Sequence, residues 1–122
     1  MNRKREKFMD NFDKHLISEA TEYEFKIALE SNKPKSWLKT VSAFANGLGG
    51  TIYIGVDDNG AIVGVSDIKV VTNKISELIK ERIDPALTSF IVIPLTIGDK
   101  TVLQLKIANG ENTPYYYVGD GS

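Results

Sequence analysis

Apolar residues recur along this chain with two different spacings, and each spacing predicts one kind of secondary structure. Repeats at every third or fourth position predict amphipathic helices, whereas alternation of apolar and polar residues predicts half-buried strands. Helical spacing is present at residues 3–17, 32–48 and 68–82. Strands are predicted at residues 21–27, 51–57, 61–65, 89–97 and 101–107. This order predicts an α+β fold with a mixed, largely antiparallel sheet and helices packed on one face.

Two of the predicted strands flank the Asn-Gly pair at residues 59–60, which is typical of a two-residue hairpin loop. Such a loop would place Gly55 opposite Gly64, on the same face as Tyr53 and Asp57. The other face would be apolar and would meet the helices; it would carry Ile52, Ile54, Val56, Val63 and Val65. We therefore predict a core that contains Trp37, Phe44, Ile54, Val56 and Val63.

The chain has 122 residues, of which 42% are apolar and 25% charged, and its formal net charge is −1. These values are typical of one compact domain, so we treat residues 1–122 as a single unit that can fold without a disulfide or metal. The sequence contains no cysteine and one histidine, His15. Disulfides, thiolate zinc sites, cysteine nucleophiles and multi-histidine metal sites are therefore excluded.

No segment of the sequence has the length of a membrane-spanning helix. The longest apolar run, residues 90–95, includes Pro94 and is far shorter than the ~18 residues that such a helix needs. The basic residues near the N-terminus are not followed by the apolar segment of a secretory signal. We therefore predict a cytoplasmic protein that makes no membrane contact.

Positive charge is concentrated near the N-terminus. Residues 1–40 contain nine Lys or Arg and seven Asp or Glu, a sum of +2, whereas residues 41–122 contain six and nine, a sum of −3. Neither part has the strongly basic footprint of a domain that binds duplex DNA by charge alone, so nucleic-acid binding requires a local patch. The candidate residues for that patch are Arg3, Lys4, Arg5, Lys26, Lys35 and Lys39.

Acidic residues in and before the first predicted strand are candidates for a metal site. Glu24 lies on the polar face of the strand, five residues after Glu19, so a bend at residues 18–21 must bring the two together. With Asp57 they would form a three-carboxylate site for Mg²⁺ or Mn²⁺, which assist phosphoryl chemistry. Asp58 is a further catalytic candidate. The alternative interpretation is a solvated strand face and two aspartates that only form a turn.

A glycine cluster at Gly47, Gly49 and Gly50 invites comparison with phosphate-binding loops. Such loops precede a helix, because the N–H groups and positive dipole end at a helix N-terminus attract anions. These glycines instead follow the predicted helix at residues 32–48. We therefore predict a glycine C-cap, and this geometry argues against an ATP phosphate site.

The last residues of the sequence resemble the beginning of a strand. Alternation at residues 115–117 would bury one or two of three consecutive tyrosines, which disfavours base stacking by all of them. A turn signal at residues 119–122 has no strand after it. We expect that the chain is truncated before the last strand of its domain.

Several short blocks occur in a distinctive order along the chain. They are Glu24-Phe25-Lys26, residues 41–51 (VSAFANGLGGT), residues 54–60 (IGVDDNG) with Val63-Gly64-Val65, and Pro114-Tyr115-Tyr116. The most specific feature is the Ser-Ala-Phe-Ala-Asn-x-x-Gly-Gly run followed by Gly-Val-Asp-Asp. From about Glu19 to the last residue, these blocks resemble the Schlafen AlbA-type domain, also labelled a divergent AAA domain.

This resemblance carries three functional implications. Prokaryotic members usually form the first domain of a longer transcriptional regulator whose C-terminal part is a winged helix, which implies a DNA-binding role and a winged-helix region beyond this sequence. In animal Schlafens the related domain cleaves RNA with two glutamates and an aspartate, which correspond to Glu19, Glu24, and Asp57 or Asp58. The AAA label implies ATP binding. The position of the glycines after a helix argues against an ATP phosphate site.

Nucleic-acid binding within a bacterial transcriptional regulator is therefore our leading interpretation. The enzymatic alternative is an endoribonuclease that requires Mg²⁺ or Mn²⁺. A third class is an assembly or effector-sensing module, including a nucleotide sensor, which would form homo-oligomers and leave DNA contact to the C-terminal part. These classes differ in what they bind, so structure and binding measurements can separate them.

Overall fold

The computed structural model describes residues 22–30 and 32–119 of the chain. The helices are α3 (Lys35–Asn46) and α4 (Ile68–Arg82). The strands are β1 (Tyr23–Lys26), β2 (Gly50–Ile54), β3 (Ile83–Asp84), β4 (Phe90–Ile97), β5 (Lys100–Ile107) and β6 (Tyr116–Tyr117). The predicted helix at residues 3–17 and the predicted bend at residues 18–21 lie outside the described residues.

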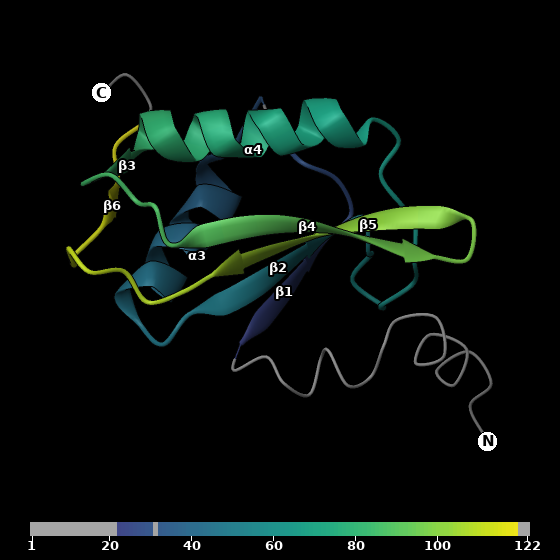
Figure 1. Ribbon diagram of the computed structural model, residues 1–122, viewed down its shortest axis with the longest axis horizontal. Coiled ribbons are helices and arrows are strands. Elements are labelled where there is room, and N and C mark those ends of the chain that lie inside the picture. Colours follow the sequence, from purple (N-terminus) through teal and green to yellow (C-terminus); the bar gives the residue numbers. More distant parts are fainter. Residues whose placement is uncertain (1–21, 31, 120–122) are drawn as a thin grey trace.

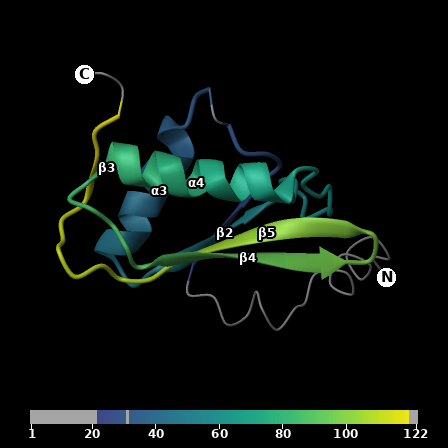
Figure 2. The same cartoon turned by 45° about the horizontal axis from the view of Figure 1, so that its top comes forward.

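Four strands form one sheet in the order β1-β2-β5-β4, and β3 and β6 form a separate antiparallel pair. Within the sheet, β1 is parallel to β2, whereas β2 and β4 are both antiparallel to β5. Both helices lie on the same side of this sheet (Figure 1, Figure 2). The predicted α+β fold, with a mixed, largely antiparallel sheet and helices packed on one face, is therefore confirmed.

Helix α3 connects the two parallel strands, because a parallel connection must cross over the sheet and a helix provides that crossover. Pro34 occupies the N-cap position, where a missing N–H costs nothing, and its carbonyl accepts a hydrogen bond from Leu38 N. Asp67 caps α4 by accepting a hydrogen bond from Val70 N at 3.4 Å. Both helix starts therefore follow from local chemistry.

The main core lies between the two helices and the sheet. Helix α3 contributes Trp37, Leu38, Val41, Phe44 and Ala45, and α4 contributes Ile75, Leu78 and Ile79. The sheet contributes Ile52, Ile54, Leu103, Leu105 and Ile107, which alternate along β2 and β5 as a pleated sheet requires. The predicted core positions Trp37, Phe44 and Ile54 are confirmed.

The sheet carries a second buried cluster on the face away from the helices. It consists of Tyr53, Val56 and Val102, and Phe25 packs against it. Burial of the Tyr53 ring raises the pKa of its hydroxyl, which is hydrogen-bonded to Gln104 on the neighbouring strand. The prediction that Tyr53 lies on the face away from the helices is confirmed, but its ring is buried there because this second face is also apolar.

A local irregularity in the chain after β2 explains why Val56 is buried in the second cluster rather than beside Ile54. The N–H groups of Gly55 and Val56 both donate to the carbonyl of Lys26, at 2.7 and 3.2 Å. Gly55 and Val56 therefore both lie opposite Lys26, as in a β-bulge. Gly55 adopts a φ of +104°, which residues with a side chain disfavour. Alternation stops at Gly55, so Val56 is buried as predicted but on the other face.

The predicted two-residue hairpin loop is also corrected. Val56 pairs with Ile62 in an isolated bridge, and Asp57 N donates to Ala61 O at 3.0 Å, so three residues form the loop. Gly60, with a φ of +86°, supplies the left-handed residue of such a loop. Because the register moves by one residue, Val63 turns outward and is 45% exposed, contrary to the prediction that it is in the core.

The glycine cluster follows α3, as predicted. Gly47 is the C-cap residue of the helix, and Gly49 N donates to Phe44 O at 2.9 Å. Gly49 has a φ of +92°, and a Cβ there would lie 2.7 Å from the carbonyl oxygen of Ile107. The glycines therefore let the chain turn closely against β5.

Candidate nucleic-acid interface

The last described residues, 110–119, form a strap that lies beside α3 (Figure 1). Asn46, at the end of α3, holds this strap with its side-chain amide. Its Nδ2 donates to Tyr115 O at 3.0 Å, and Tyr115 N donates to its Oδ1 at 2.7 Å. An amide side chain has both a donor and an acceptor, so Asn46 pairs with the strap backbone as a neighbouring strand would.

The strap is held at its other end by the segment after α4. Strand β6 pairs with β3, with Tyr117 opposite Ile83, and Val118 N donates to Arg82 O at 2.9 Å. A Cβ at Gly119 would overlap the side chain of Arg82, so the strap lies directly on that side chain. Residues 115–119 are therefore fixed at both ends, next to Lys35, Lys39 and Ser42 of α3.

The three tyrosines of the strap differ in exposure. Tyr115 is buried, at 3% exposed, and its hydroxyl accepts a hydrogen bond from Asn112 N at 2.9 Å. Tyr116 is 60% exposed, and Tyr117 is partly buried against the main core. The sequence prediction that alternation buries one or two of them is confirmed, and two aromatic rings remain at the surface.

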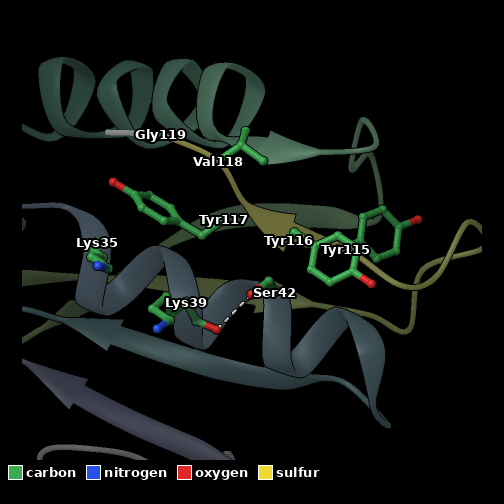
Figure 3. Close-up of a pocket in the computed structure, with 8 residues that line it drawn as sticks. All are labelled: Lys35, Lys39, Ser42, Tyr115, Tyr116, Tyr117, Val118 and Gly119. Carbon is green, nitrogen blue, oxygen red and sulfur yellow. Dashed lines mark hydrogen bonds between the residues drawn. The ribbon is translucent and has the colours of Figure 1, made fainter. Parts of the chain in front are cut away.

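Two hollows adjoin each other where the strap meets α3. The first, of about 420 Å³, is lined by Lys35, Lys39, Ser42 and residues 115–119. Figure 3 shows Tyr117 extending from the strap toward the N-terminal half of α3, on the side of Lys35. The second hollow, of about 670 Å³, is lined by Glu30, Asn32, Lys33, Pro34, Lys35, Ser36, Lys39, Arg82 and Tyr117. We call the two hollows together the strap groove.

The charge of the strap groove is predominantly positive. Four cationic side chains line it, Lys33, Lys35, Lys39 and Arg82, against the single carboxylate of Glu30. Within residues 22–30 and 32–119, neither Lys35 nor Lys39 has an ion-pair partner. The first turn of α3 contains no acidic residue, so the positive end of its dipole adds to this field. The groove therefore attracts anions.

Two further predicted residues lie beside the groove, between β1 and α3. Glu24 and Lys26 occupy the helix side of β1, level with Ile52 and Ile54. Their charged groups are 3.7 Å apart, and Thr40 Oγ1 lies 3.4 Å from both Glu24 carboxylate oxygens. Lys26 Nζ also donates to Ser36 Oγ at 3.4 Å, and Ser36 lines the second hollow.

The predicted aspartates lie in the loop after β2. One carboxylate oxygen of Asp57 accepts hydrogen bonds from Asn59 N and Ala61 N, each at 2.9 Å. This arrangement is an Asx-type turn, in which the side chain replaces a backbone acceptor. Asp58 follows in the same loop. The interpretation of Asp57 as a turn residue is thus confirmed, and its role as a metal ligand stays a prediction.

The structure brings together only some of the predicted site residues. Lys35 and Lys39 lie side by side on α3, and Glu24 and Lys26 form the adjacent pair. In the part of the chain that the structure describes, no three acidic or histidine side chains converge on a common point. Glu19 and the basic residues Arg3, Lys4 and Arg5 lie outside that part, so their predicted roles are untested.

No local pattern in the sequence indicates Lys33, Arg82 or Tyr117 as residues of this site. The sequence predicts Arg82 at the end of a helix and Tyr117 in a strand, and it indicates no contact between them. Their proximity depends on β3 and β6 pairing over more than thirty residues of sequence. The signal present in the sequence was Asn46, a polar residue on the same stripe as Lys35 and Lys39.

Comparison with known families gives the class of this domain. Residues 19–122 match the family described as Schlafen, AlbA_2. The chain therefore belongs to the Schlafen AlbA_2 family, as the sequence blocks indicated. Neither of the two described helices is long and apolar enough to cross a membrane.

Solved structures share this fold. One is the N-terminal domain of a RecG-related protein from Nitrosomonas europaea, whose name refers to ATP-dependent DNA helicases; it is 24% identical, with a TM-score of 0.64. The match covers 95% of this chain and 81% of that one. Another is DIP2311 from Corynebacterium diphtheriae, 19% identical with a TM-score of 0.57, of which this chain spans 25% while 98% of this chain is covered. A comparison with curated protein sequences finds no match.

Proposed function

We propose that this Schlafen AlbA_2 domain binds nucleic acid through the strap groove. The observation that carries the proposal is the position of Lys35 and Lys39, without ion-pair partners among the described residues, directly beside Tyr116 and Tyr117. Lysines bind phosphate groups, and aromatic rings bind bases or sugars, so one groove offers partners for both parts of a nucleotide.

Electrostatics favours this ligand over a neutral one. Four cations and the N-terminal dipole of α3 act on the same groove, against one carboxylate. The chain as a whole has a net charge of −1, so the groove is a local basic patch on an otherwise balanced surface. The name of the structural neighbour from Nitrosomonas europaea, which refers to DNA helicases, agrees with a nucleic-acid role.

Family context extends the proposal to the whole protein. In a longer bacterial transcriptional regulator, this domain would contact nucleic acid while a C-terminal winged helix contributes sequence recognition. The strap groove would then supply phosphate contacts that position the partner, since such contacts carry no sequence information directly. The N-terminal residues Arg3, Lys4 and Arg5, and Lys26 beside the groove, would extend those contacts.

A salt-dependent titration tests the proposal. Fluorescently labelled single strands and hairpin duplexes of about 12 nucleotides are titrated with the chain between about 50 and 200 mM salt. The double variant Lys35→Ala, Lys39→Ala should bind at least about tenfold more weakly at the lowest salt, with a salt slope shallower by about 1.4 to 1.8. The matched control is Lys69→Ala, Lys106→Ala, which removes two exposed lysines elsewhere.

Two results would overturn the proposal. One is the absence of binding by the unaltered chain to any of the nucleic acids at low salt. The other is equal weakening by the groove variant and the control variant, since that would indicate a diffuse charge effect rather than a site. Light scattering of the same samples identifies the assembly class, because a sensing or assembly module would form oligomers without binding nucleic acid.

A metal-dependent endoribonuclease is the second candidate function, and one observation favours it. Glu24 lies beside the groove, with Lys26 at 3.7 Å and Ser36 between that lysine and the second hollow. A carboxylate and an ammonium at the edge of a phosphate-binding groove are groups that a phosphodiester cleavage site uses, with Mg²⁺ or Mn²⁺ held by Glu24 and the predicted Glu19. Because Asp57 already accepts two backbone hydrogen bonds, its participation would require sharing that carboxylate with the metal.

A further inference from the structure

Tyr117 is shared by the two hollows of the strap groove. Its side chain lines both of them, as do Lys35 and Lys39. The remaining residues differ: Tyr116 and Ser42 line the first hollow, whereas Lys33 and Arg82 line the second, among others. The two hollows therefore share one aromatic residue and two lysines, and each has further lining residues of its own.

We infer that the strap groove takes single-stranded nucleic acid in preference to duplex. Two successive nucleotides would occupy the two hollows, with their linking phosphate at Lys35 and Lys39 and an unstacked base against Tyr117. This inference rests on the proposed function and names the substrate class of the same site. It predicts a preference that charge alone would not produce.

The size of the hollows fits single nucleotide units. Volumes of about 420 and 670 Å³ lie within the range of roughly 300–1,000 Å³ that is typical of small-ligand pockets. Bases within a duplex are stacked on both faces and cannot enter such spaces. Bases of a single strand can turn outward and stack on an aromatic ring, which is the common mode of single-strand recognition.

The tyrosines are held before any ligand arrives. The backbone of Tyr117 pairs with Ile83, and its ring packs against the main core. Tyr116 precedes it in the same strand, and the Asn46 amide fixes Tyr115 next to both. A ring that is already positioned loses little conformational entropy on binding, so stacking contributes more of its energy to affinity.

The distribution of charge also disfavours a duplex. A domain that binds duplex by its phosphates needs several cations spread along one face, whereas the four groove cations surround two hollows. Glu30 lines the second hollow. Asp84 lies opposite Tyr116 in the β3–β6 pair, and Tyr116 lines the first hollow. These carboxylates would repel the additional phosphates that the second backbone of a duplex brings to the groove.

The test is a competition titration at fixed salt. A labelled single strand of about 12 nucleotides is displaced by unlabelled single-stranded DNA, single-stranded RNA, or a hairpin duplex of the same composition. We expect the single strands to compete at least about tenfold better than the duplex, since stacking contributes about 5- to 150-fold per base. The DNA and RNA arms show whether the 2′-hydroxyl contributes.

Tyrosine variants separate stacking from charge. Tyr117→Leu should weaken single-strand binding by about 5- to 150-fold, whereas Tyr117→Phe retains the ring and should bind as the unaltered chain does. Tyr116→Leu, at an exposed position, serves as a second variant that does not affect the core. Tyr23→Leu is the matched control, because Tyr23 is an exposed tyrosine of β1, 47% exposed, that does not line the groove.

The outcomes distinguish this inference from the proposed function. Equal or better competition by duplex, with binding still lost in Lys35→Ala, Lys39→Ala, would contradict the inference and leave nucleic-acid binding intact. Single-strand binding unaffected by both leucine variants would likewise contradict it. If no nucleic acid competes and none binds directly, the proposed function fails and the inference fails with it.

Discussion

The side-chain amide of Asn46 makes two hydrogen bonds to the backbone of Tyr115, 69 residues further along the chain, at 3.0 and 2.7 Å. This pair connects the end of α3 to the strap and so determines where the strap tyrosines lie. The lysines on α3 and the tyrosines on the strap come from distant parts of the sequence. Their proximity in one groove depends on this contact and on the pairing of β3 with β6.

Replacing Asn46 should therefore weaken both the fold and the groove. Asn46→Ala leaves the N–H and C=O of Tyr115 without their partner, which should lower the free energy of unfolding by about 1–3 kcal/mol. Asn46→Asp keeps the acceptor but places a second oxygen against the Tyr115 carbonyl, so it should not restore stability. Urea unfolding measures the first effect, and single-strand titration measures the loss of affinity.

Asn73→Ala, on the exposed side of α4, is the matched control for Asn46. It should change neither unfolding nor binding. If Asn46→Ala unfolds like the control, the strap is held by other contacts, and the account of how Tyr115 is positioned is wrong.

A pair of glycines tests the close turn after α3. Gly49 and Gly98 both have positive φ angles, of +92° and +64°. A Cβ at Gly49 would lie 2.7 Å from Ile107 O, whereas a Cβ at Gly98 would meet nothing within 4 Å. Gly98→Ala should cost about 1–2 kcal/mol from the left-handed backbone alone, and Gly49→Ala about 3 kcal/mol or more. Equal losses in urea unfolding would show that the contact with β5 is unimportant.

The buried Tyr53 predicts a loss of stability at alkaline pH. Desolvation by burial raises the pKa of its hydroxyl above the usual 10.0, with a smaller opposing effect from the hydrogen bond to Gln104. The unfolded chain therefore releases this proton at lower pH than the folded chain does. The contribution of the neutral Tyr53 hydroxyl to the free energy of unfolding is fully present below pH 10.0. It is lost as the pH rises through the pKa that this hydroxyl has in the folded chain.

Unfolding free energies measured at neutral pH and above pH 10.0 check this expectation. The unaltered chain should become less stable across that interval, and Tyr53→Phe should show a shallower decline because its ring has no proton to lose. The same alkaline slope in both proteins would be evidence that Tyr53 is not the responsible group.

Glu24 provides a probe of the enzymatic alternative that does not disturb the fold. Its ion pair with Lys26 joins side chains that are 37% and 22% exposed, so Glu24→Gln should alter stability by less than about 1 kcal/mol. If the chain is a metal-dependent endoribonuclease, Glu24→Gln should abolish the cleavage of structured RNA in Mg²⁺ or Mn²⁺ and leave RNA binding largely intact. Cleavage that survives the substitution would refute the assignment of Glu24.

Helix α3 and the β4–β5 hairpin could be predicted because their signals are local. The helical spacing of Trp37, Val41 and Phe44 and the glycines that follow locate α3 from the sequence alone. The same spacing places Lys35 and Lys39 together on the outer side of the helix. These features need no information about distant parts of the chain.

The second buried face of the sheet and the strap could not be predicted in this way. Alternation assigned Val56 and Val63 to the helix side, but the double hydrogen bond to Lys26 O at Gly55 interrupts the pleat. The alternation of apolar and polar residues does not show at which residue a bulge interrupts the strand. The contact between Asn46 and Tyr115 is likewise invisible to local patterns, because it joins two segments whose sequences carry no common signal.

An NMR titration of the ¹⁵N-labelled chain with a short single strand shows directly whether the strap groove is the nucleic-acid site. We expect amide shifts to change at residues 33–42 and 115–119, and the same changes to be absent in the Lys35→Ala, Lys39→Ala variant. Shift changes confined to the opposite face of the sheet, around Phe25, Tyr53 and Leu95, would contradict this expectation.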